Sequence, residues 1–305
     1  MENNKKKLEK KVAVIIPSFK ASKTLRFVVE KVFEELQFLK QLYNYQLIVI
    51  DDSCPEECWK TIVDYRKIKI INNKYNLGVG GSTLRGIEFA LENHFDAIIK
   101  LDADGQHPPK YLKELIPYIF SLPKYELFLT KGTRYKIMPS SSKTPPTRRI
   151  GTFFLDPIAR MALSYRGLSD VTNGFLGLDA TSAKFLLYSD NGIKLKYRYL
   201  FESSLLAKCS ELGFKLNEFC ILPEYGDDWY SSMNAFSMII PLLRFWFKTA
   251  LNRIVRKYLI NFNLGSLLLL ISFLNIILFQ FLFFRSVLPG LKNSVLATAG
   301  TSAAF

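Results

Sequence analysis

The sequence has few of the residues that cross-link small secreted domains or bind soft metals. Its 305 residues include four cysteines and two histidines, and the cysteines form no C-x-x-C pair. This usage indicates a reducing compartment rather than a disulfide-linked secreted scaffold. A zinc site built from Cys54 and Cys58 with the two distant thiols, Cys209 and Cys220, is the alternative to four ordinary buried thiols.

Two common phosphate-binding fingerprints are also missing. The glycine-rich segment NLGVGGS, residues 76–82, has no G-K-[ST] ending, which excludes a Walker loop. No G-x-G-x-x-G follows the first predicted strand, so the dinucleotide-binding fingerprint is absent as well. The glycines of this segment instead indicate a backbone that takes positive φ angles and approaches another group closely.

Acidic residues are absent from the basic stretch that precedes the most apolar part of the chain. Residues 264–284 read LGSLLLLISFLNIILFQFLFF, an uncharged run long enough to cross a hydrocarbon core. The basic residues before it are Arg244, Lys248, Arg253, Arg256 and Lys257. By the positive-inside tendency they keep the N-terminal part of the chain cytoplasmic. The net charge of +14 therefore indicates attraction to a membrane surface, and nucleic acid is not an expected partner.

These shifts in composition predict five parts of the chain. They are a basic N-terminal tail (1–11) unlike a secretory signal, an α/β domain (12–235), a basic amphipathic interfacial segment (236–263), a transmembrane helix (264–284), and a last part (285–305) that is a tail or the start of a second membrane segment. In the interfacial segment, aromatic residues such as Trp246 alternate with basic ones, as in helices that lie in a membrane surface. We expect a single- or two-pass protein of the cell membrane, and the oligomeric state stays open.

Strands and helices are predicted to alternate through the N-terminal half. Apolar, β-rich runs predict strands at residues 12–16, 46–50, 68–71 and 97–101, and helical spacing predicts helices over 22–39 and about 83–92. Ser22 is the predicted N-cap of the first helix. This alternation implies right-handed crossovers and a mainly parallel α/β sheet with helices on both faces.

Polar residues follow three of these strands, and the predicted fold would bring them to one edge. Pro17-Ser18 ends the first strand, Asp51-Asp52 ends the second, and Asp102-Ala103-Asp104 follows the fourth. Two carboxylates in a D-x-D turn can share Mg²⁺ or Mn²⁺, which prefer oxygen ligands and often hold phosphates. A solvated turn is the alternative for a D-x-D alone, and an N-cap near Pro55 is the alternative for Asp51-Asp52. The combination of strand ends favours a metal site.

An ordered set of short motifs extends from Val12 to Ser232. The set is VIIPSFK, LIVIDDS, NLGVGGSTLRGI, LDADGQHPP, KGTRY, DVTNGF and the FE…GFKLNE…PEYGDDWYSS segment. In this order the motifs resemble family-2 glycosyltransferases of the GT-A fold, and among them the dolichyl- and polyprenyl-phosphate sugar transferases. The α/β domain over 12–235 is then a GT-A catalytic domain. The Q-x-x-R-W signature of processive synthases is absent, and the second motif reads DDSC where many relatives have a Gly.

The resemblance also implies a role for each candidate residue. The nucleotide would be bound by Pro17, Ser18, Asp51, Asp52, Gly78 and Asp102. The cofactor, Mg²⁺ or Mn²⁺, would be held by Asp102, Asp104 and Gln106. Phosphate groups would meet Arg134 and Arg149, the transferred sugar would lie near Asp170 and Asn173, and Glu202 would be on the acceptor side. The residues expected to act in catalysis are Asp102, Asp104, Arg134, Asp170 and Glu202.

The expected reaction moves a sugar from a UDP- or GDP-sugar to polyprenyl phosphate, with inversion. A phosphate acceptor is mostly anionic at cytoplasmic pH and needs no general base. The alternative acceptor, a hydroxyl of a lipid-linked or cell-surface glycan, needs a carboxylate such as Asp170 or Glu202. His107 is either a base or a residue that structures its turn. A non-catalytic membrane scaffold that has kept the fold is the interpretation from a different class.

Overall fold

The computed structural model describes residues 10–134, 146–165, 167–190, 192–222 and 235–301. The chain divides into two compact units, Met1–Thr249 and Ala250–Phe305. The boundary between them lies inside the segment 236–263 that the sequence pattern treats as one piece. The predicted N-terminal tail falls mostly outside the described residues.

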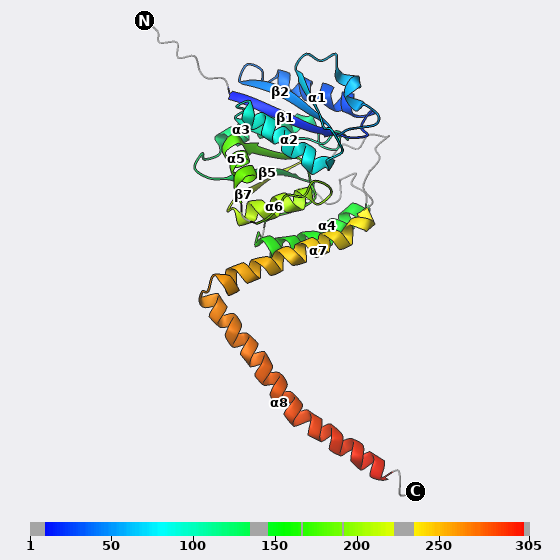
Figure 1. Ribbon diagram of the computed structural model, residues 1–305, viewed down its shortest axis with the longest axis vertical. Helices are drawn as coiled ribbons and strands as arrows, with labels where there is room; N and C mark the ends of the chain where they lie inside the picture. The colour runs from blue at the N-terminus through cyan, green and yellow to red at the C-terminus, as the bar shows by residue number, and fades with distance from the viewer. Residues whose placement is uncertain (1–9, 135–145, 166, 191, 223–234, 302–305) are drawn as a thin grey trace. The chain divides into compact units, whose positions relative to one another are not determined.

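Seven strands form one mixed sheet in the first unit, in the order β3-β2-β1-β4-β6-β5-β7. Figure 1 labels β2, β1, β5 and β7 of this sheet. The strands are β1 (Lys10–Ser18), β2 (Tyr43–Asp51), β3 (Ile68–Asn72), β4 (Ala97–Lys100), β5 (Phe128–Thr133), β6 (Leu176–Asp179) and β7 (Lys215–Cys220). The first four pair in parallel, which confirms the predicted parallel half. β6 runs antiparallel to both β4 and β5, and β5 pairs in parallel with β7.

Eight α-helices and three short helical segments connect and follow these strands in the described residues. The α-helices are α1 (Leu25–Gln37), α2 (Gly78–Glu92), α3 (Leu112–Ser121), α4 (Pro146–Leu163), α5 (Ala180–Tyr188), α6 (Phe201–Glu211), α7 (Ala235–Ile254) and α8 (Leu264–Thr301). The short segments are η1 (Cys58–Ile62), η2 (Pro109–Tyr111) and the π-helical η3 (Val255–Ile260).

The predicted N-cap of the first helix is wrong. α1 begins at Leu25, and the residue before it, Thr24, makes no capping bond with its side chain. The Ser22 hydroxyl instead donates a hydrogen bond of 2.7 Å to the Glu56 carboxylate. The Ser22 side chain, which the local pattern assigns to the helix end, is therefore bound by Glu56, a residue far away in the sequence.

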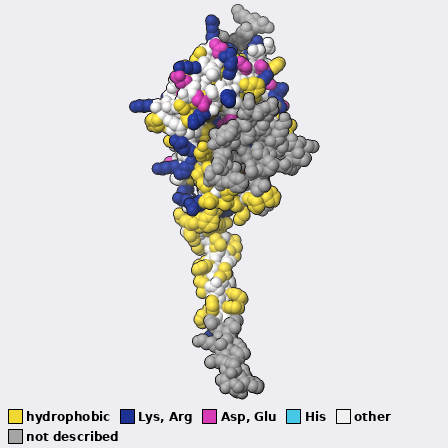
Figure 2. All heavy atoms as spheres, turned by 90° about the vertical axis from the view of Figure 1, so that its right-hand side faces the viewer, with side chains coloured by type: hydrophobic (Ala, Val, Ile, Leu, Met, Phe, Trp, Pro, Cys, Tyr) yellow, Lys and Arg dark blue, Asp and Glu magenta, His cyan; other side chains and the backbone are white. Residues whose placement is uncertain are grey.

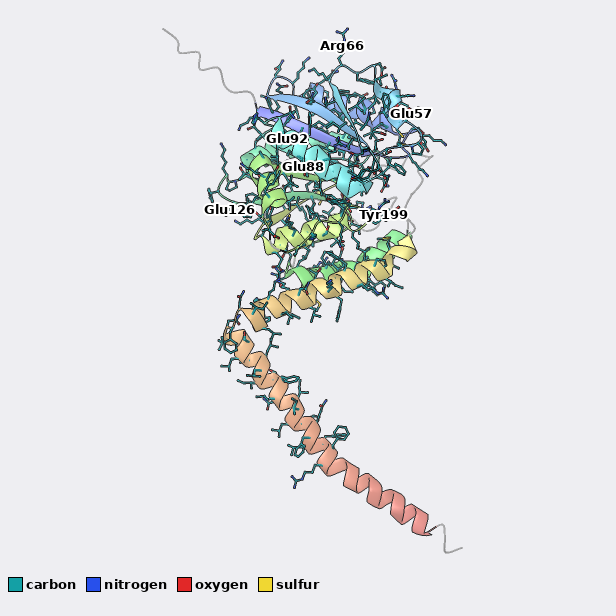
Figure 3. All side chains as sticks on the ribbon, viewed as in Figure 1. Glu57, Arg66, Glu88, Glu92, Glu126 and Tyr199 are labelled. Atoms are coloured by element: carbon teal, nitrogen blue, oxygen red, sulfur yellow. The ribbon has the colours of Figure 1, made fainter. Side chains whose placement is uncertain are left out.

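Helices cover both faces of the sheet, so its central strands are buried on two sides. Successive side chains of a strand point to opposite faces. Val12, Val14 and Ile16 of β1 belong to the core that contains residues of α1 and α3. Ile15 lies on the other face, against Gly86 of α2. The outer side of α2 carries exposed acidic residues such as Glu88 (Figure 3). Burial on both faces explains why these strands read as continuous apolar runs.

The second unit contains the long apolar helix. Residues Leu264–Arg285 of α8 have a mean hydropathy of 2.6 and are exposed except near Ser266, and by length and composition they could cross a membrane. Figure 2 shows hydrophobic side chains along the described part of this helix. The helical backbone continues beyond the predicted end at residue 284 and reaches Thr301.

The predicted placement of Trp246 at a membrane surface is wrong. Its side chain is fully buried inside the first unit, and Leu242, one helical turn earlier in α7, is buried too. Both residues lie on one face of the helix, four positions apart. The basic residues Arg244 and Lys248 are exposed, as is Phe247. The buried face of α7 around Leu242 and Trp246 therefore packs the helix onto the rest of the first unit.

Replacing Gly86 with alanine should destabilise the protein. A Cβ at this position would lie 2.6 Å from Cγ2 of the buried Ile15, so α2 or β1 must shift. Alanine in a helix interior normally stabilises by about 0.5–1 kcal/mol, whereas overpacking costs about 1–3 kcal/mol. We expect a lower melting temperature by scanning fluorimetry. Gly167→Ala is the control, since nothing lies within 4 Å of its added Cβ; equal melting temperatures for the two variants would contradict this packing.

Candidate active site

The carboxyl ends of the parallel strands meet at one edge of the sheet. Ser18 at the end of β1 pairs in register with Asp51 at the end of β2. On the other side of β1, Ile15 pairs with Lys100, the last residue of β4. The turn at residues 102–104 therefore starts level with the end of β1. The predicted meeting of the polar strand ends is confirmed.

Two buried oxygen atoms at this edge have no hydrogen-bond partner among the described residues. They are the Ser18 hydroxyl and Oδ1 of Asp51, which sit on paired strand positions. Burial raises the pKa of the Asp51 carboxyl. Buried polar groups of folded proteins are nearly always paired, so atoms like these indicate a place where a polar ligand binds. Hydroxyl and imide N–H groups of a nucleoside are suitable partners for both.

Asp52, next to Asp51, is engaged within the protein. Its Oδ1 accepts hydrogen bonds from Nδ2 of Asn73 at 2.7 Å and from the backbone N–H of Leu77 at 2.8 Å. Its Oδ2 accepts from the backbone N–H of Gly78 at 2.8 Å. A carboxylate at the start of a helix satisfies free N–H groups and opposes the positive end of the helix dipole. Asp52 thus joins the end of β2 to the start of α2.

The glycine-rich segment is approached closely by another part of the chain. Gly78 has a φ of +80°, and a Cβ there would lie 2.6 Å from the carbonyl oxygen of Tyr197. That same oxygen accepts from the backbone N–H groups of Gly80 at 2.7 Å and Gly81 at 3.2 Å. The predicted positive φ and close approach are confirmed. The approaching group is backbone near Tyr197, which lets α2 begin five residues before the predicted start at residue 83.

The D-x-D turn after β4 is held by its neighbours. Nζ of Lys100 lies 2.5 Å from Oδ1 of Asp102, and the backbone N–H of Asp102 donates to Nδ1 of His107 at 3.2 Å. Asp104 accepts from the backbone N–H of Gln106 at 3.0 Å and from its side-chain amide. Burial lowers the pKa of His107 to about 4, so the ring is neutral near pH 7. His107 supports the shape of the turn in this arrangement.

Lys100 is a site residue that sequence reasoning missed. Its side chain is fully buried, with Asp102 on one side and Oε1 of Glu202 at 3.7 Å. Burial alone would lower the pKa of Lys100, but Asp102 and Glu202 raise it above its usual value. The amine therefore stays charged beside the D-x-D turn. A lysine inside the apolar run IIKL was the signal that could have revealed it.

Gly174 brings the NGF segment against the same group. A Cβ at this position would collide with Nζ of Lys100 and lie 2.9 Å from Oδ2 of Asp102 and 3.2 Å from Oε1 of Glu202. Only a residue without a side chain leaves these three groups where they are. The structure thus brings together Asp102, Glu202 and the DVTNGF motif, three predicted parts of the site.

Arg134 and Asp170 form a buried, two-pronged ion pair beside this cluster. Nε of Arg134 donates to Oδ2 of Asp170 at 2.7 Å, and its NH2 group donates to Oδ1 at 2.6 Å. Nδ2 of Asn173 donates to the same carboxylate at 3.1 Å. Burial alone would raise the pKa of Asp170, but Arg134 lowers it to about 2. Burial alone would raise the pKa of Asp102, but the positive charge of Lys100 lowers it. The charge of Arg134 acts in the same direction.

The family model described as "Glycosyl transferase family 2" matches residues 13–181, more than half of the chain. The chain belongs to glycosyl transferase family 2. It is 28% identical over 172 residues to a "Dolichol-phosphate mannosyltransferase" of Pyrococcus furiosus, covering 55% of this chain and 46% of that protein. It is 26% identical to a "UDP-N-acetylglucosamine--dolichyl-phosphate N-acetylglucosaminyltransferase" of Methanococcus voltae, covering 67% of this chain and 83% of that one.

Solved structures confirm the GT-A fold of this glycosyltransferase. Glucosyl-3-phosphoglycerate synthase of Mycobacterium tuberculosis, in complex with Mn²⁺, uridine-diphosphate and phosphoglyceric acid, superposes with a TM-score of 0.57 at 12% identity, over 79% of this chain and 78% of that one. Mannosyl-3-phosphoglycerate synthase of Rubrobacter xylanophilus gives a TM-score of 0.56 at 13% identity, over 83% and 76%. At these identities the likeness shows the fold alone.

The residues of the D-x-D turn fit a hard divalent cation. Asp102, Asp104 and Gln106 offer only carboxylate and amide oxygens, the ligands that Mg²⁺ and Mn²⁺ prefer. The Asp102 side chain keeps 29% of its surface exposed, so a ligand can reach it. The predicted phosphate-binding Arg149 lies in α4, and its side chain is outside the described part of the structure.

A second buried network supports the loop that carries Asp170 in the transferase. Asp156 of α4 accepts from the backbone N–H groups of Asp170 at 2.9 Å and Val171 at 3.2 Å. The fully buried Lys131 donates to the carbonyl oxygens of Ser169 at 2.9 Å and Asp170 at 2.8 Å. Sequence reasoning missed Asp156 and Lys131, because their partners lie far away along the chain. Together they fix Asp170, which itself has a φ of +52°.

Replacing Gly174 with alanine should abolish most transferase turnover. The added methyl group would displace Lys100 and Asp102, and misplacing catalytic groups by about 1 Å can cost roughly 100-fold in rate. We expect a fall of about that size in turnover measured by release of nucleoside diphosphate. Gly167→Ala should keep wild-type turnover. Near-normal activity of Gly174→Ala would show that the contact does not matter for catalysis.

Asp156 should make stability depend on pH. Burial raises the pKa of this carboxyl to about 6 from an ordinary 3.8. The folded state therefore holds its proton more tightly, and this contribution is complete below about pH 4 and is lost as pH rises through 6. The loss amounts to about 3 kcal/mol from the size of the shift.

An Asp156→Asn variant tests this dependence. We expect its melting temperature to vary less between pH 4.5 and 7.5 than that of the wild type, whose melting temperature should decline over this range relative to the variant. The measurement is scanning fluorimetry of both proteins in the same buffers. Parallel curves would show that Asp156 does not titrate there.

Proposed function

We propose that this glycosyltransferase moves a sugar from a nucleoside diphosphate sugar to a polyprenyl phosphate at the cytoplasmic face of the membrane, with inversion at the anomeric carbon. The observation that carries the proposal is the cluster at the sheet edge. A D-x-D turn, in which the Asp102 side chain keeps 29% of its surface exposed, lies beside the buried cations Lys100 and Arg134. The relatives from Pyrococcus furiosus and Methanococcus voltae are both named for dolichol phosphate or dolichyl phosphate, which supports this class of acceptor.

The donor nucleotide is assigned to the ends of β1, β2 and β4. Pro17 and Ser18 and the buried Asp51 would bind its base and ribose, since Ser18 and Asp51 carry the unsatisfied polar atoms. Asp102, Asp104 and Gln106 would hold Mg²⁺ or Mn²⁺, which when bound neutralises charge on the leaving diphosphate. Lys100 and Arg134 keep Asp102 ionised and place fixed positive charge near it.

Asp52 and Gly78 take part in donor binding indirectly in this proposal. Both carboxylate oxygens of Asp52 accept hydrogen bonds, from Asn73 and from the start of α2. The backbone at Gly78 packs against residue 197. They would therefore shape the nucleotide edge by holding β2 and α2 in register. Arg149 stays a predicted phosphate ligand.

Of the two candidate bases, Asp170 favours an acceptor that arrives already charged. Asp170 is fully buried, is paired on both oxygens with Arg134, and has a pKa of about 2, so it is a poor proton acceptor. Glu202 faces Lys100 in the cluster around Asp102. A phosphate monoester with a second pKa near 6 is mostly anionic at cytoplasmic pH and needs positioning rather than a base. Asp170 and Asn173 would then position Arg134, and Glu202 would orient Lys100 and the acceptor.

Membrane attachment is assigned to α8. Its apolar stretch Leu264–Arg285 follows the basic residues of α7 and η3. Basic residues beside a span favour the cytoplasmic side and attract anionic lipid headgroups. Attachment would keep the catalytic unit at the surface where a polyprenyl phosphate presents its headgroup.

A product assay with the full chain tests the proposal. The protein in detergent or nanodiscs receives Mg²⁺ or Mn²⁺, a panel of UDP- and GDP-sugars, and dolichyl or undecaprenyl phosphate. We expect mass spectrometry to find a lipid-linked sugar with at least one donor. Asp102→Asn should lower its formation by about 100-fold or more, since charge stabilisation at such sites contributes that much.

Asp64→Asn is the matched control, because Asp64 is exposed and pairs with Arg26 on the surface. It should keep wild-type product formation. Absence of a lipid-linked sugar with every donor, while nucleotide sugars still bind in a titration, would reject the lipid phosphate acceptor. Transfer to a glycan hydroxyl that depends strongly on Glu202→Gln would support the alternative acceptor.

A further inference from the structure

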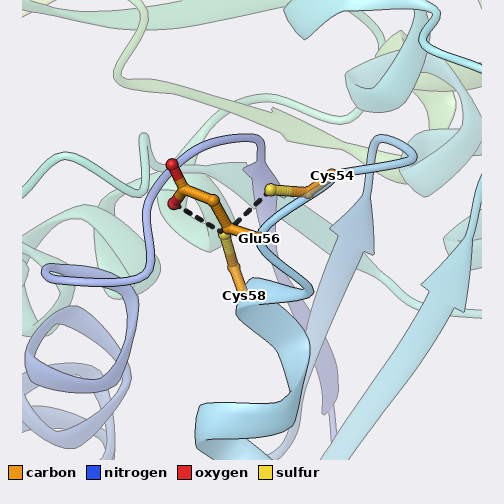
Figure 4. A group of neighbouring side chains, drawn as sticks. All are labelled: Cys54, Glu56 and Cys58. Carbon is orange, nitrogen blue, oxygen red and sulfur yellow. Dashed lines mark hydrogen bonds between the residues drawn. The ribbon is translucent and has the colours of Figure 1, made fainter.

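A compact group of sulfur and oxygen atoms lies in the loop after β2. Sγ of Cys54 is 3.0 Å from Sγ of Cys58, and Sγ of Cys58 is 3.9 Å from Oε2 of Glu56 (Figure 4). One ligand atom from each of the three residues lies within 4.8 Å of the others. Both thiols are buried, and Glu56 is exposed. Cys209 and Cys220 are not part of this group, so the alternative of a four-cysteine zinc site is wrong.

Three consecutive residues of the loop after β1 hold the three ligand groups. The backbone N–H of Lys20 donates to Sγ of Cys54 at 3.0 Å, and that of Ala21 donates to Sγ of Cys58 at 3.1 Å. The Ser22 hydroxyl donates to Oε2 of Glu56 at 2.7 Å. These distances are short for contacts to sulfur, a larger atom than oxygen. In proteins, the side chains that bind a metal ion are commonly held by hydrogen bonds from neighbouring groups. Each of the three candidate ligands here accepts such a bond.

The backbone around this group is held in an unusual conformation. Lys20, Ser53 and Glu57 have φ angles of 53°, 56° and 48°, and they make up half of the six non-glycine residues with positive φ in the described chain. Residues other than glycine keep such angles only where the surroundings hold them. Here the two loops hold each other at the thiols.

We propose that Cys54, Glu56 and Cys58 bind a soft divalent cation such as Zn²⁺, at a site distinct from the D-x-D turn. Zinc takes thiolate and carboxylate ligands and is usually four-coordinate, so three protein ligands leave one position for water. Tetrahedral zinc would place the two sulfur atoms roughly 3.8 Å apart, which requires them to separate by under 1 Å. The exposed Glu56 marks the side from which the ion enters.

The chemistry of binding is balanced by proton release. Each thiol gives its proton to the solvent as its sulfur becomes a metal-bound thiolate, so uptake of one ion releases two protons and changes no oxidation state. Binding would also join two loops of the nucleotide edge. Thr24, in the same loop as Lys20, donates a hydrogen bond of 2.7 Å to the carbonyl oxygen of Ala103 inside the D-x-D turn. The cation would thus fix the loop between β1 and α1 against the proposed donor site.

Spectroscopy of the whole protein tests the site independently of catalysis. Reduced, chelator-treated full chain is titrated with Co²⁺, which gives a thiolate charge-transfer band in the near ultraviolet, and then with Zn²⁺, which displaces it. We expect one equivalent to bind, two protons to be released, and a melting temperature raised by several degrees with Zn²⁺. Alkylation followed by mass spectrometry should show Zn²⁺ protecting Cys54 and Cys58 and leaving Cys220 unchanged.

Variants separate this site from the rest of the protein. Cys58→Ser should abolish the band, and Ser22→Ala, which removes a partner of a ligand and no ligand, should weaken Zn²⁺ binding about 10-fold. Cys209→Ser and Asp104→Asn should keep the band, which distinguishes the site from the other buried thiol and from the D-x-D turn.

The proposal is overturned by an absent thiolate band in the reduced wild type, by equal alkylation with and without Zn²⁺, or by a band that survives Cys58→Ser. Isolation of the protein with a Cys54–Cys58 disulfide that takes up no Co²⁺ after reduction would also overturn it. The wild-type measurements decide the matter even if Cys58→Ser does not fold. Failure of the lipid-linked sugar assay would not affect this result, because metal uptake is measured without donor or acceptor.

Discussion

Burying a charged group is unfavourable unless an opposite charge and hydrogen bonds meet it, and this constraint shapes the whole site. Lys100 is fully buried and stays charged because Asp102 and Glu202 surround it. The two carboxylates come from the turn after β4 and from α6, and Gly174, in the loop before β6, packs against all three groups. If one of them moved, the buried amine would lose its compensation. The cluster therefore fixes how the halves of the sheet meet.

The Arg134–Asp170 pair meets the same constraint in the second half of the sheet, because each buried charge lies against the opposite one. Its two short hydrogen bonds are buried, and Lys131 and Asp156 hold the backbone of the Asp170 loop from both sides. Breaking such a pair by removing one partner typically costs about 3–5 kcal/mol. Fixed charges of this kind need no rearrangement when negative charge develops on a leaving group. In the proposed reaction, rigid placement and electrostatic assistance would thus come from one network.

The proposed nucleotide edge, at the ends of β1 and β2, is organised differently, through backbone contacts. Asp52 closes the start of α2, and the loop after β1 rests on Cys54 and Cys58. Ser18 and Asp51 remain as the groups with unsatisfied atoms. The protein therefore uses most polar groups at this edge to hold its own loops and leaves a small number for a ligand.

The strands, the motifs and the apolar helix could be read from the sequence, because each depends on a local pattern. Runs such as VAVII and LIVI become strands buried on both faces, and the order of the strand-end motifs places Ser18, Asp51 and Asp102 at one edge. The length and the apolar composition of one run of residues are enough to identify α8 as a helix that could cross a membrane.

Other features depended on partners that are distant in the chain. Ser22 stands where the local pattern predicts a helix cap, yet its hydroxyl donates a hydrogen bond to Glu56, 34 positions away. Trp246 follows an interfacial pattern, yet packing buries it completely. Lys100 and Gly174 acquire their roles only where β4, α6 and the loop before β6 converge. Local pattern determined which segments form and where their polar ends lie, whereas the compensation of buried charge, a property of the folded chain, decided which side chains act together.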